Sequence, residues 1–328
     1  MHFHLTEEQA AIQEAVRGTL ADSWPMECIH AFADGNEDFD PESWKALMAL
    51  GLGGILLPDS GMGLLEAALV SEVAGEAAAA GPLIGQLLAA AAVAASGGAS
   101  LDALVSGEAV ATLVHGGSAF VPCARAADFF LIVDRDAGVR LVAADEDVTI
   151  EAVRASDRTR PVSRVEIADR AGKPLFAAAD PITARLADAA LVLVAADALG
   201  GSQKVTDMSV AYAKEREQFG QPIGRFQGLK HQLAHMALDV EPARALVWYA
   251  AYAWDAHLPD APRAAAMAKA HLCDAYVRAT RAAVAAHGGI GYTWEYGLNY
   301  WFRRAAFDRA WLGSPAEQRA RAATLAGW

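Results

Sequence analysis

The fold of this chain is decided by the stretch YAKEREQFGQPIGRFQGLKH, residues 212–231. Gly220, Pro222 and Gly224 fall within five residues of one another, and few helices continue through such a run. We therefore predict the end of one helix, a tight connection and the start of a second helix. Arg216 and Phe219 stand three residues apart just before the break, so they share one face of the first helix.

The residues around this connection suit a dinucleotide. Arg216 offers a planar cation, Phe219 an aromatic ring and Gln227 an amide. Such groups can bind the diphosphate and the adenine of a nucleotide. The alternative is a helix hairpin with a solvated polar corner, and spacing alone leaves both interpretations open.

Two blocks of this chain resemble the acyl-CoA dehydrogenases. The first, REQFGQPIGRFQ (residues 216–227), is similar to the Arg-x-x-Phe-Gly segment of that family. The second, HGGIGYTWEY (residues 287–296) followed by Arg303 and Arg304, is similar to the family's glycine-rich segment near the C-terminus. The blocks come in the family's order and at about its separation. The resemblance covers residues 186–310 and, more weakly, the N-terminal third.

The composition is that of a globular protein. The chain has 328 residues, of which 54% are hydrophobic and 20% are charged, enough for a large core and one to three domains. The net charge of −13 argues against nucleic acid or an anionic membrane surface as the main partner. Cys28, Cys123 and Cys273 match no metal-binding spacing, which indicates reduced thiols in the cytoplasm.

Neither a targeting segment nor a membrane span is expected. The N-terminus lacks a basic region followed by an apolar one, so we predict no signal peptide. Residues 77–101 carry no charge and are long enough to cross a bilayer. Gly81-Pro82 and Ser96-Gly97-Gly98 interrupt this stretch, so close-packed core helices explain it better, and we expect a soluble cytoplasmic protein.

The predicted elements give an α+β fold in three parts: an N-terminal helical domain (1–106), a small β-domain (107–180) and a C-terminal four-helix bundle (181–328). Thr6 and Gln9 form a capping box for the first helix, and further helices are predicted over 64–80 and 83–95. Runs of β-forming residues predict about five strands ending near Phe176. This order matches the acyl-CoA dehydrogenase architecture.

The bundle is predicted from a stripe of apolar residues. It runs through residues 229–247 at spacings of four and three, with Pro242 inside it as an expected kink. The aromatic residues nearby are expected in the core or at an interface: Trp248, Tyr249, Tyr252 and Trp254. His231 and His235 lack a third ligand, so no metal site is predicted.

The resemblance implies an FAD enzyme that desaturates an acyl-CoA thioester between its α and β carbons. In the family, FAD lies between the sheet and the bundle of one subunit and reaches the arginine turn and the glycine segment of a neighbouring subunit. Carried over, Arg216 contacts the diphosphate, and Gln218 and Phe219 contact the adenosine side. The remaining contacts are Ile223 and Gln227 beside them, with Gly288 and Gly289 as a backbone floor.

The family's catalytic base has no counterpart at its usual place. In the family this base is usually a glutamate followed by glycine, and the corresponding residue here is Leu312, which cannot accept a proton. A minority of the family place the glutamate on the helix before the arginine turn. Residues 188–191 occupy that stretch here and include no glutamate, while Asp188 is shorter. We therefore predict no catalytic residue in this chain.

These departures resemble the short subunit of bacterial heteromeric acyl-CoA dehydrogenases, such as those acting on steroid side-chain CoA esters. There a longer, base-bearing homologue completes the site, so the resemblance implies a heterotetramer, with a homo-oligomer as the other possibility. Two alternatives stay open: a self-sufficient enzyme with Asp188 or Glu317 as a displaced base, and a scaffold that binds no flavin.

One further motif is the segment Asp157-Arg-Thr-Arg-Pro161. Its two arginines could bind a phosphate, and a solvated loop is at least as good an interpretation.

Overall fold

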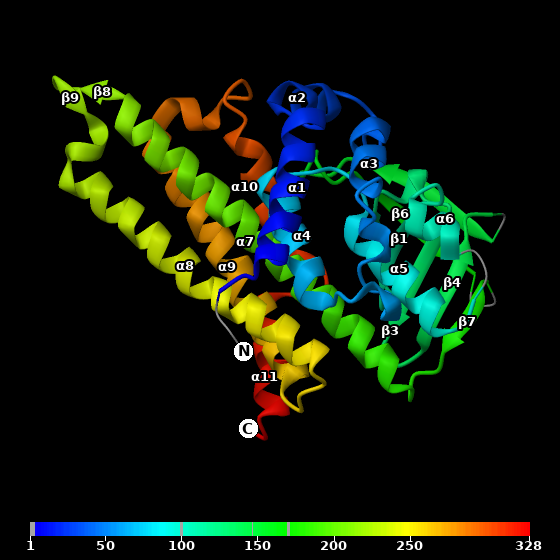
Figure 1. Ribbon diagram of the computed structural model, residues 1–328. Helices are drawn as coiled ribbons and strands as arrows, with labels where there is room; N and C mark the ends of the chain where they lie inside the picture. The colour runs from blue at the N-terminus through cyan, green and yellow to red at the C-terminus, as the bar shows by residue number, and fades with distance from the viewer. Residues whose placement is uncertain (1–3, 99–100, 146, 169–170) are drawn as a thin grey trace.

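The computed structural model describes residues 4–98, 101–145, 147–168 and 171–328. N-terminal helices, two small sheets and a C-terminal helical bundle follow one another in the predicted α+β order (Figure 1). The N-terminal helices are α1 (Glu7–Ser23), α2 (Met26–Asp34), α3 (Pro41–Met48), α4 (Leu64–Glu76), α5 (Leu83–Ala95) and α6 (Leu101–Ser106).

Local signals set the ends of these helices. The Thr6 side chain accepts a hydrogen bond from the Gln9 amide, and the Gln9 side chain accepts one from the Thr6 amide, so the predicted capping box is present. Helix α4 ends at Glu76, earlier than the predicted residue 80, because Ala78 has left-handed backbone (φ 47°). None of the helices in the described ranges is long and apolar enough to span a bilayer.

The β-region forms two sheets with seven strands in the described residues, where about five strands were predicted. The first has the order β1-β3-β4-β7 and the second the order β2-β6-β5. The bounds are β1 (Ala111–His115), β2 (Phe120–Pro122), β3 (Phe129–Asp134), β4 (Gly138–Ala143), β5 (Val148–Val153), β6 (Val162–Ile167) and β7 (Lys173–Phe176). Strand β1 pairs parallel to β3, and the other pairings within these two sheets are antiparallel.

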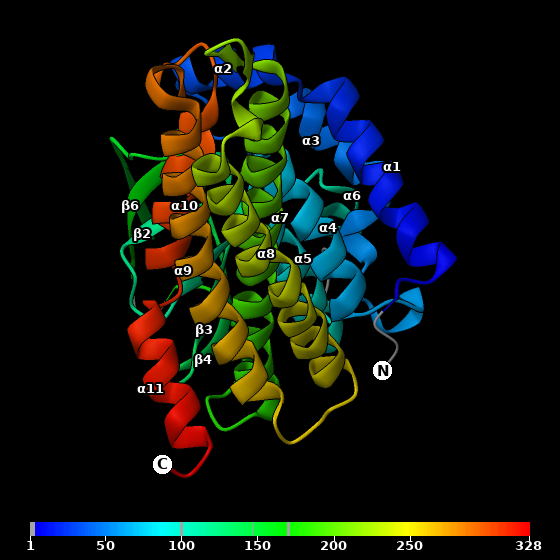
Figure 2. The same ribbon diagram turned by 90° about the vertical axis from the view of Figure 1, so that its left-hand side faces the viewer.

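The C-terminal part is built on long helices that lie side by side (Figures 1 and 2). These are α7 (Pro181–Glu215), α8 (Gln227–Asp255) and α9 (Ala261–His287), with α10 (Leu298–Ala310) and α11 (Pro315–Leu325) packed on α9. Helix α8 continues through Pro242. The short β8 (Glu217–Gln218) and β9 (Gln221–Pro222) join α7 to α8.

Helix α4 is seated directly on α7, which places the N-terminal helices against the bundle. A side chain at Gly75 would collide with the backbone of Asp197, and one at Gly200 would collide with the carbonyl oxygen of Glu72. Glycines at both positions therefore let the two backbones approach each other. One buried apolar cluster runs through the N-terminal helices, the first sheet and the bundle.

Candidate functional site: an exposed turn and a closed centre

The turn between α7 and α8 is a two-residue hairpin. Phe219 (φ 53°) and Gly220 (φ 77°) are its central residues, and both have positive φ, as a type I′ turn requires. The predicted helix, connection and helix are therefore confirmed. The prediction that Arg216 and Phe219 share one helix face is wrong, because α7 ends at Glu215 and both residues have non-helical backbone. The Phe219 side chain is 92% exposed and meets Phe226 edge to face at 6.0 Å between ring centroids. An exposed phenylalanine on a strained backbone is available to a ligand or a partner.

The backbone of Arg216 links the end of α7 to the far side of the turn. Its amide donates to the Tyr212 carbonyl at 2.8 Å, and its carbonyl accepts from the Ile223 amide at 2.8 Å. The exposed Arg216 guanidinium makes no hydrogen bond or ion pair with any residue in the described ranges. Gln218 and Gln227 are exposed beside it. The backbone is fixed while the cation remains free.

The glycine segment follows α9. Gly288 has φ 64° and ψ −138°, a conformation that is almost restricted to glycine. A side chain at Gly288 or Gly289 would meet nothing within 4 Å, and both residues are exposed. The backbone here is bare and open to an approaching molecule.

His287 joins the turn to the glycine segment. Its ring stacks on Tyr212 at 4.6 Å, one turn of α7 before Arg216. Nδ1 lies 2.7 Å from the Ala283 carbonyl and Nε2 lies 2.9 Å from the Tyr296 hydroxyl. Burial lowers the pKa of His287, so the neutral ring donates from Nδ1 and accepts from Tyr296. His287 opens the second sequence block, but the sequence predicted no role for it.

The two sequence blocks therefore share one end of the bundle, which both views show (Figures 1 and 2). We call residues 216–227 together with Gly288 and Gly289 the bundle tip. A free guanidinium, an exposed aromatic ring and open glycine backbone are groups that fit the diphosphate and adenosine of FAD. Those groups face solvent, and none of them faces the interior of this chain.

The position of the family's usual base lies in the loop between α10 and α11. Leu312 has left-handed backbone (φ 61°) and is 3% exposed. Its carbonyl accepts from the Gln318 side-chain amide at 2.9 Å. The leucine side chain belongs to the apolar core, so this loop presents no proton acceptor.

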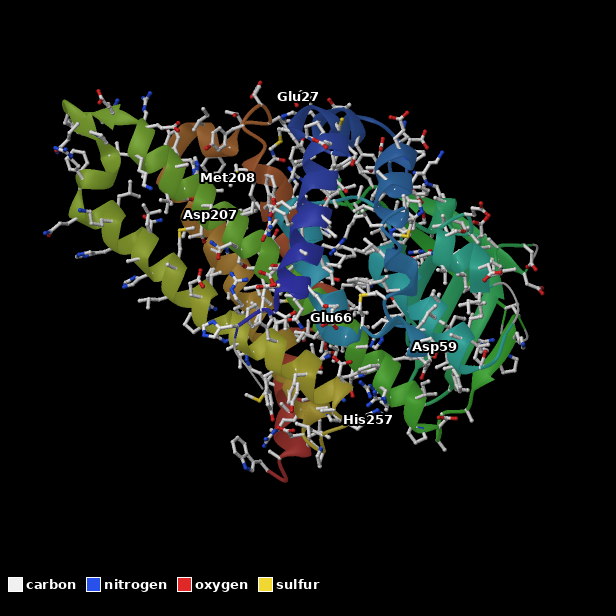
Figure 3. The ribbon with its side chains drawn as sticks, in the orientation of Figure 1. Glu27, Asp59, Glu66, Asp207, Met208 and His257 are labelled. Carbon is white, nitrogen blue, oxygen red and sulfur yellow. The ribbon has the colours of Figure 1, made fainter. Side chains whose placement is uncertain are left out.

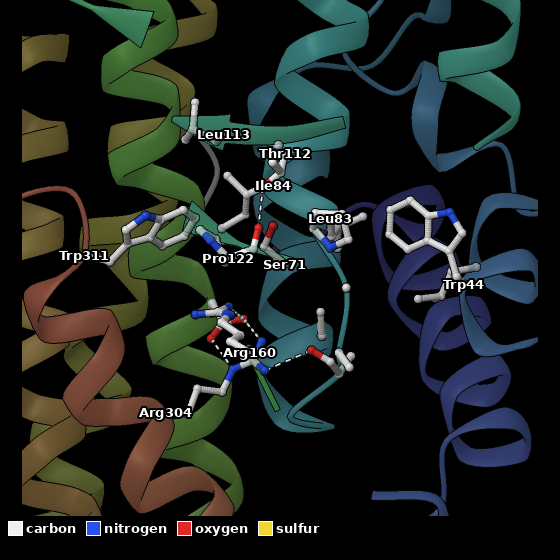
Figure 4. A pocket seen from close by; sticks show the side chains of 18 residues that line it. Trp44, Ser71, Leu83, Ile84, Thr112, Leu113, Pro122, Arg160, Arg304 and Trp311 are labelled. Carbon is white, nitrogen blue, oxygen red and sulfur yellow. Dashed lines mark hydrogen bonds and ion pairs between the residues drawn. The ribbon is translucent and has the colours of Figure 1, made fainter. Parts of the chain in front are cut away.

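A buried set of charges, which we call the closed centre, lies beside that loop. It consists of Arg160, Asp197, Lys269, Arg304 and Asp308. Arg160 pairs with Asp308 and, at 2.6 Å, with Asp197. Arg304 pairs with the same Asp197 at 2.6 Å. Lys269 donates to the Asp308 carbonyl at 2.7 Å. Figure 4 shows Arg160 and Arg304 converging on this point.

The electrostatics of the closed centre are tightly balanced. Burial opposes ionisation of Asp197, but Arg160 and Arg304 outweigh it and hold the pKa of Asp197 at about 2. Burial raises the pKa of Asp308 to about 8. Two arginines thus enclose one firmly ionised carboxylate and a second carboxylate that retains its proton more readily.

Both sequence interpretations of the segment from Asp157 to Pro161 are wrong for Arg160. It is 5% exposed and committed to two aspartates, so it is neither solvated nor free for a phosphate. Asp197, 37 residues further along the chain, is its partner, and no local pattern indicates this pairing. Arg158 instead stays half-buried, with its guanidinium 5.5 Å from the Trp294 ring.

Little space remains around the closed centre. A cavity bounded by Arg160, Arg304, Trp311 and residues 79–85 has a volume of only about 30 Å³ (Figure 4), roughly the room of one water molecule. Sites for small molecules and cofactors measure about 300–1,000 Å³. The cavity at the closed centre is therefore too small for the flavin ring of FAD.

The two alternative bases are both engaged elsewhere. Asp188 is buried and pairs with Arg135 and Arg321, each at 2.7 Å. Glu317 caps the first turn of α11 by accepting from the Ser314 amide at 2.6 Å, and that bond lowers its pKa. Neither carboxylate lies among the residues that bound the small cavity.

The remaining candidates lie on the surface of the bundle. His231 and His235 are exposed on α8. No group of three or more histidine, cysteine, aspartate or glutamate side chains in the described residues is arranged to hold a metal ion.

Comparisons with known proteins agree with this geometry. Residues 6–103 match the model of the acyl-CoA dehydrogenase N-terminal domain, and residues 183–325 match that of the acyl-CoA dehydrogenase C-terminal domain. The chain is 30% identical over 325 residues to acyl-CoA dehydrogenase IpdE2 of Mycolicibacterium smegmatis, covering 97% of this chain and 98% of the relative. The chain belongs to the acyl-CoA dehydrogenase family.

Solved structures share the whole fold of this chain. The Tcur3481-Tcur3483 steroid ACAD superposes with a TM-score of 0.88 at 25% identity and covers 98% of both chains. The structure described as PigA with FAD and proline superposes with a TM-score of 0.86 at 21% identity, covering 100% of this chain and 99% of the other. An acyl-CoA dehydrogenase fold that carries FAD in a solved neighbour is thus the fold of this chain, as predicted.

Proposed function

We propose that this chain is the FAD-contacting, base-lacking subunit of a heteromeric acyl-CoA dehydrogenase. A longer, base-bearing homologue completes the site, and the complex desaturates an acyl-CoA thioester. The observation that carries the proposal is a difference between two regions of the chain. The bundle tip offers unpaired cofactor-binding groups to solvent, whereas Leu312 offers no proton acceptor and the cavity at the closed centre is too small for a flavin ring.

The bundle tip would hold the adenosine half of an FAD whose ring lies in the partner. Arg216 would pair with the diphosphate, and Gln218 and Phe219 would contact the adenosine, with Ile223 and Gln227 beside them. Gly288 and Gly289 would let the diphosphate approach the backbone because a side chain is absent. When bound, FAD supplies the acceptor for the hydrogen that leaves the β carbon.

Proton abstraction belongs to the partner in this proposal. A positioned carboxylate contributes about 10²- to 10⁴-fold to such a step, and Leu312 cannot replace it. Support for a two-protein assembly comes from the paired name of the Tcur3481-Tcur3483 steroid ACAD. We extend the proposal to a heterotetramer acting in the cytoplasm on steroid side-chain CoA esters, with domains at 1–106, 107–180 and 181–328.

Co-expression tests the assembly. We expect the chain to co-purify with a longer homologue encoded beside it, and the complex to hold FAD and to reduce it when an acyl-CoA is added. A stable complex that refuses FAD would favour the scaffold alternative. Failure of every neighbouring longer homologue to bind would count against the heteromer.

Two substitutions separate this proposal from a self-sufficient enzyme. In the complex, Asp188→Asn and Glu317→Gln should each leave the turnover number within about twofold, provided that thermal melting shows the variant to be folded. If either residue were the base, its loss would cost about 10²- to 10⁴-fold. A loss of that size in a folded variant would establish the displaced-base alternative.

A further inference from the structure

A second cavity, of about 680 Å³, lies where α1 and α2 meet α4, α7 and α10. It shares no bounding residue with the small cavity at the closed centre, and none with the bundle tip. Its volume is within the range of about 300–1,000 Å³ that is typical of small-molecule sites. Asp207 and Met208, two of its bounding residues on α7, are labelled in Figure 3.

Apolar side chains form most of its wall. Trp24 lies between α1 and α2, Ile29 on α2, Met208 on α7 and Trp301 on α10. Trp301 is held in place because its indole nitrogen donates to the carbonyls of Gly75 and Glu76 at 3.1 and 3.2 Å. The wall is therefore a preformed aromatic and aliphatic surface, which favours binding because little ordering is needed.

The acidic groups at this cavity already have partners. Glu76 accepts from Arg17 at 3.1 Å, and Asp207 accepts from Gln203 at 2.9 Å.

One cation at the cavity has no acceptor among the described residues. The Lys204 ammonium lies 5.9 Å from the centre of the Trp301 ring and forms no ion pair or hydrogen bond there. A free cation beside an apolar wall is complementary to an anionic group that is joined to an apolar body.

We propose that this cavity binds a small amphipathic carboxylate. Its carboxylate pairs with Lys204, and its apolar body lies against the apolar wall of the cavity. This inference does not depend on the proposed function, because it uses none of the residues of the bundle tip or the closed centre.

The experiment uses cis-parinaric acid and its methyl ester as probes, titrated into the purified chain and into its complex with the partner. Fluorescence should show saturable binding of the acid at one site per chain in both samples. Lys204→Met should weaken binding of the acid by about tenfold or more, the usual effect of losing a charged hydrogen bond. The same substitution should leave binding of the uncharged ester unchanged.

Lys214→Met is the matched control, since Lys214 is exposed on the same helix and does not bound the cavity. It should bind both probes like the wild type. Ala211→Trp, at the exposed edge of the cavity, should block both probes while melting normally. The proposal is overturned by non-saturable binding, by equal effects of the two lysine substitutions, by blocked binding in the complex, or by Ala211→Trp leaving binding intact.

Discussion

At the scale of single residues, the free guanidinium of Arg216 is the feature with the clearest consequence. We expect Arg216→Gln in the complex to weaken FAD binding by about tenfold to a hundredfold, because a charged hydrogen bond contributes about 1.5–3 kcal/mol. Thermal stability of the lone chain should stay the same, since the side chain has no partner in the described residues. Recovery of free-flavin fluorescence on dilution measures the change.

The control for this substitution is Arg281→Gln, because Arg281 is also exposed but lies on α9 about two helical turns before Gly288, outside the bundle tip. It should release FAD at the wild-type rate. Equal flavin loss from both variants would show that general charge, and not the position of Arg216, holds the cofactor.

His287 gives a pH dependence with a definite sign. Burial lowers its folded-state pKa below the ordinary value of 6.5, so the unfolded chain binds the extra proton more readily. The stability that the neutral ring contributes is present above about pH 6.5 and is lost as pH falls through the lower folded-state pKa. We expect His287→Gln to show a smaller loss of stability than the wild type between pH 7 and pH 5. Urea unfolding at each pH measures it, and identical slopes for both proteins would contradict the assignment.

The sequence predicted which short blocks would come together. Arg216, Phe219 and the two glycines of the bundle tip lie in two such blocks, and the structure brings those blocks to one end of the bundle, while their role in binding FAD stays a prediction. The role of Arg160 could not be predicted, because its partners Asp197 and Asp308 lie 37 and 148 residues away in the chain. A loop arginine becomes buried only when two other helices supply carboxylates.

At the scale of elements, the contact of α4 with α7 fixes how the N-terminal helices sit on the bundle. We expect Gly200→Ala to destabilise the chain by about 1–3 kcal/mol, the usual cost of forcing an extra carbon into a packed interface. The added carbon would meet the Glu72 carbonyl. Denaturant unfolding measures the loss.

Gly228→Ala is the matched substitution for that experiment. Gly228 is exposed near the start of α8, and a side chain there meets nothing within 4 Å. It should be neutral or stabilising by up to about 1 kcal/mol. A loss at Gly228 as large as the loss at Gly200 would mean that the collision with the Glu72 carbonyl does not set the effect.

Two of the strands show why the sequence predicted fewer strands than the structure has. Strand β2 has three residues and ends on a proline, and β5 alternates between exposed and half-buried positions. Neither sequence has the apolar run that marks β1 or β3. Both segments are strands because they pair with β6, and this pairing cannot be read from their own residues. The long helices were predicted well, because their apolar periodicity repeats over many turns.

At the scale of the whole molecule, the groups that fit a cofactor lie on the outside, and the closed centre leaves room for only about one water molecule. A chain of net charge −13 attracts an anionic cofactor only where its cations are locally unpaired, as at Arg216. The arginines of the closed centre, by contrast, form ion pairs with aspartates. This distribution is what a subunit needs if it completes another chain's flavin site.

The most direct test is a comparison of flavin content and acyl-CoA-dependent flavin reduction in the lone chain and in its complex with the longer homologue. We predict that the lone chain, refolded or purified with excess FAD, retains no stoichiometric flavin and desaturates no acyl-CoA, while the complex does both. A lone chain that holds FAD and bleaches it on adding an acyl-CoA would contradict the proposal of a base-lacking subunit.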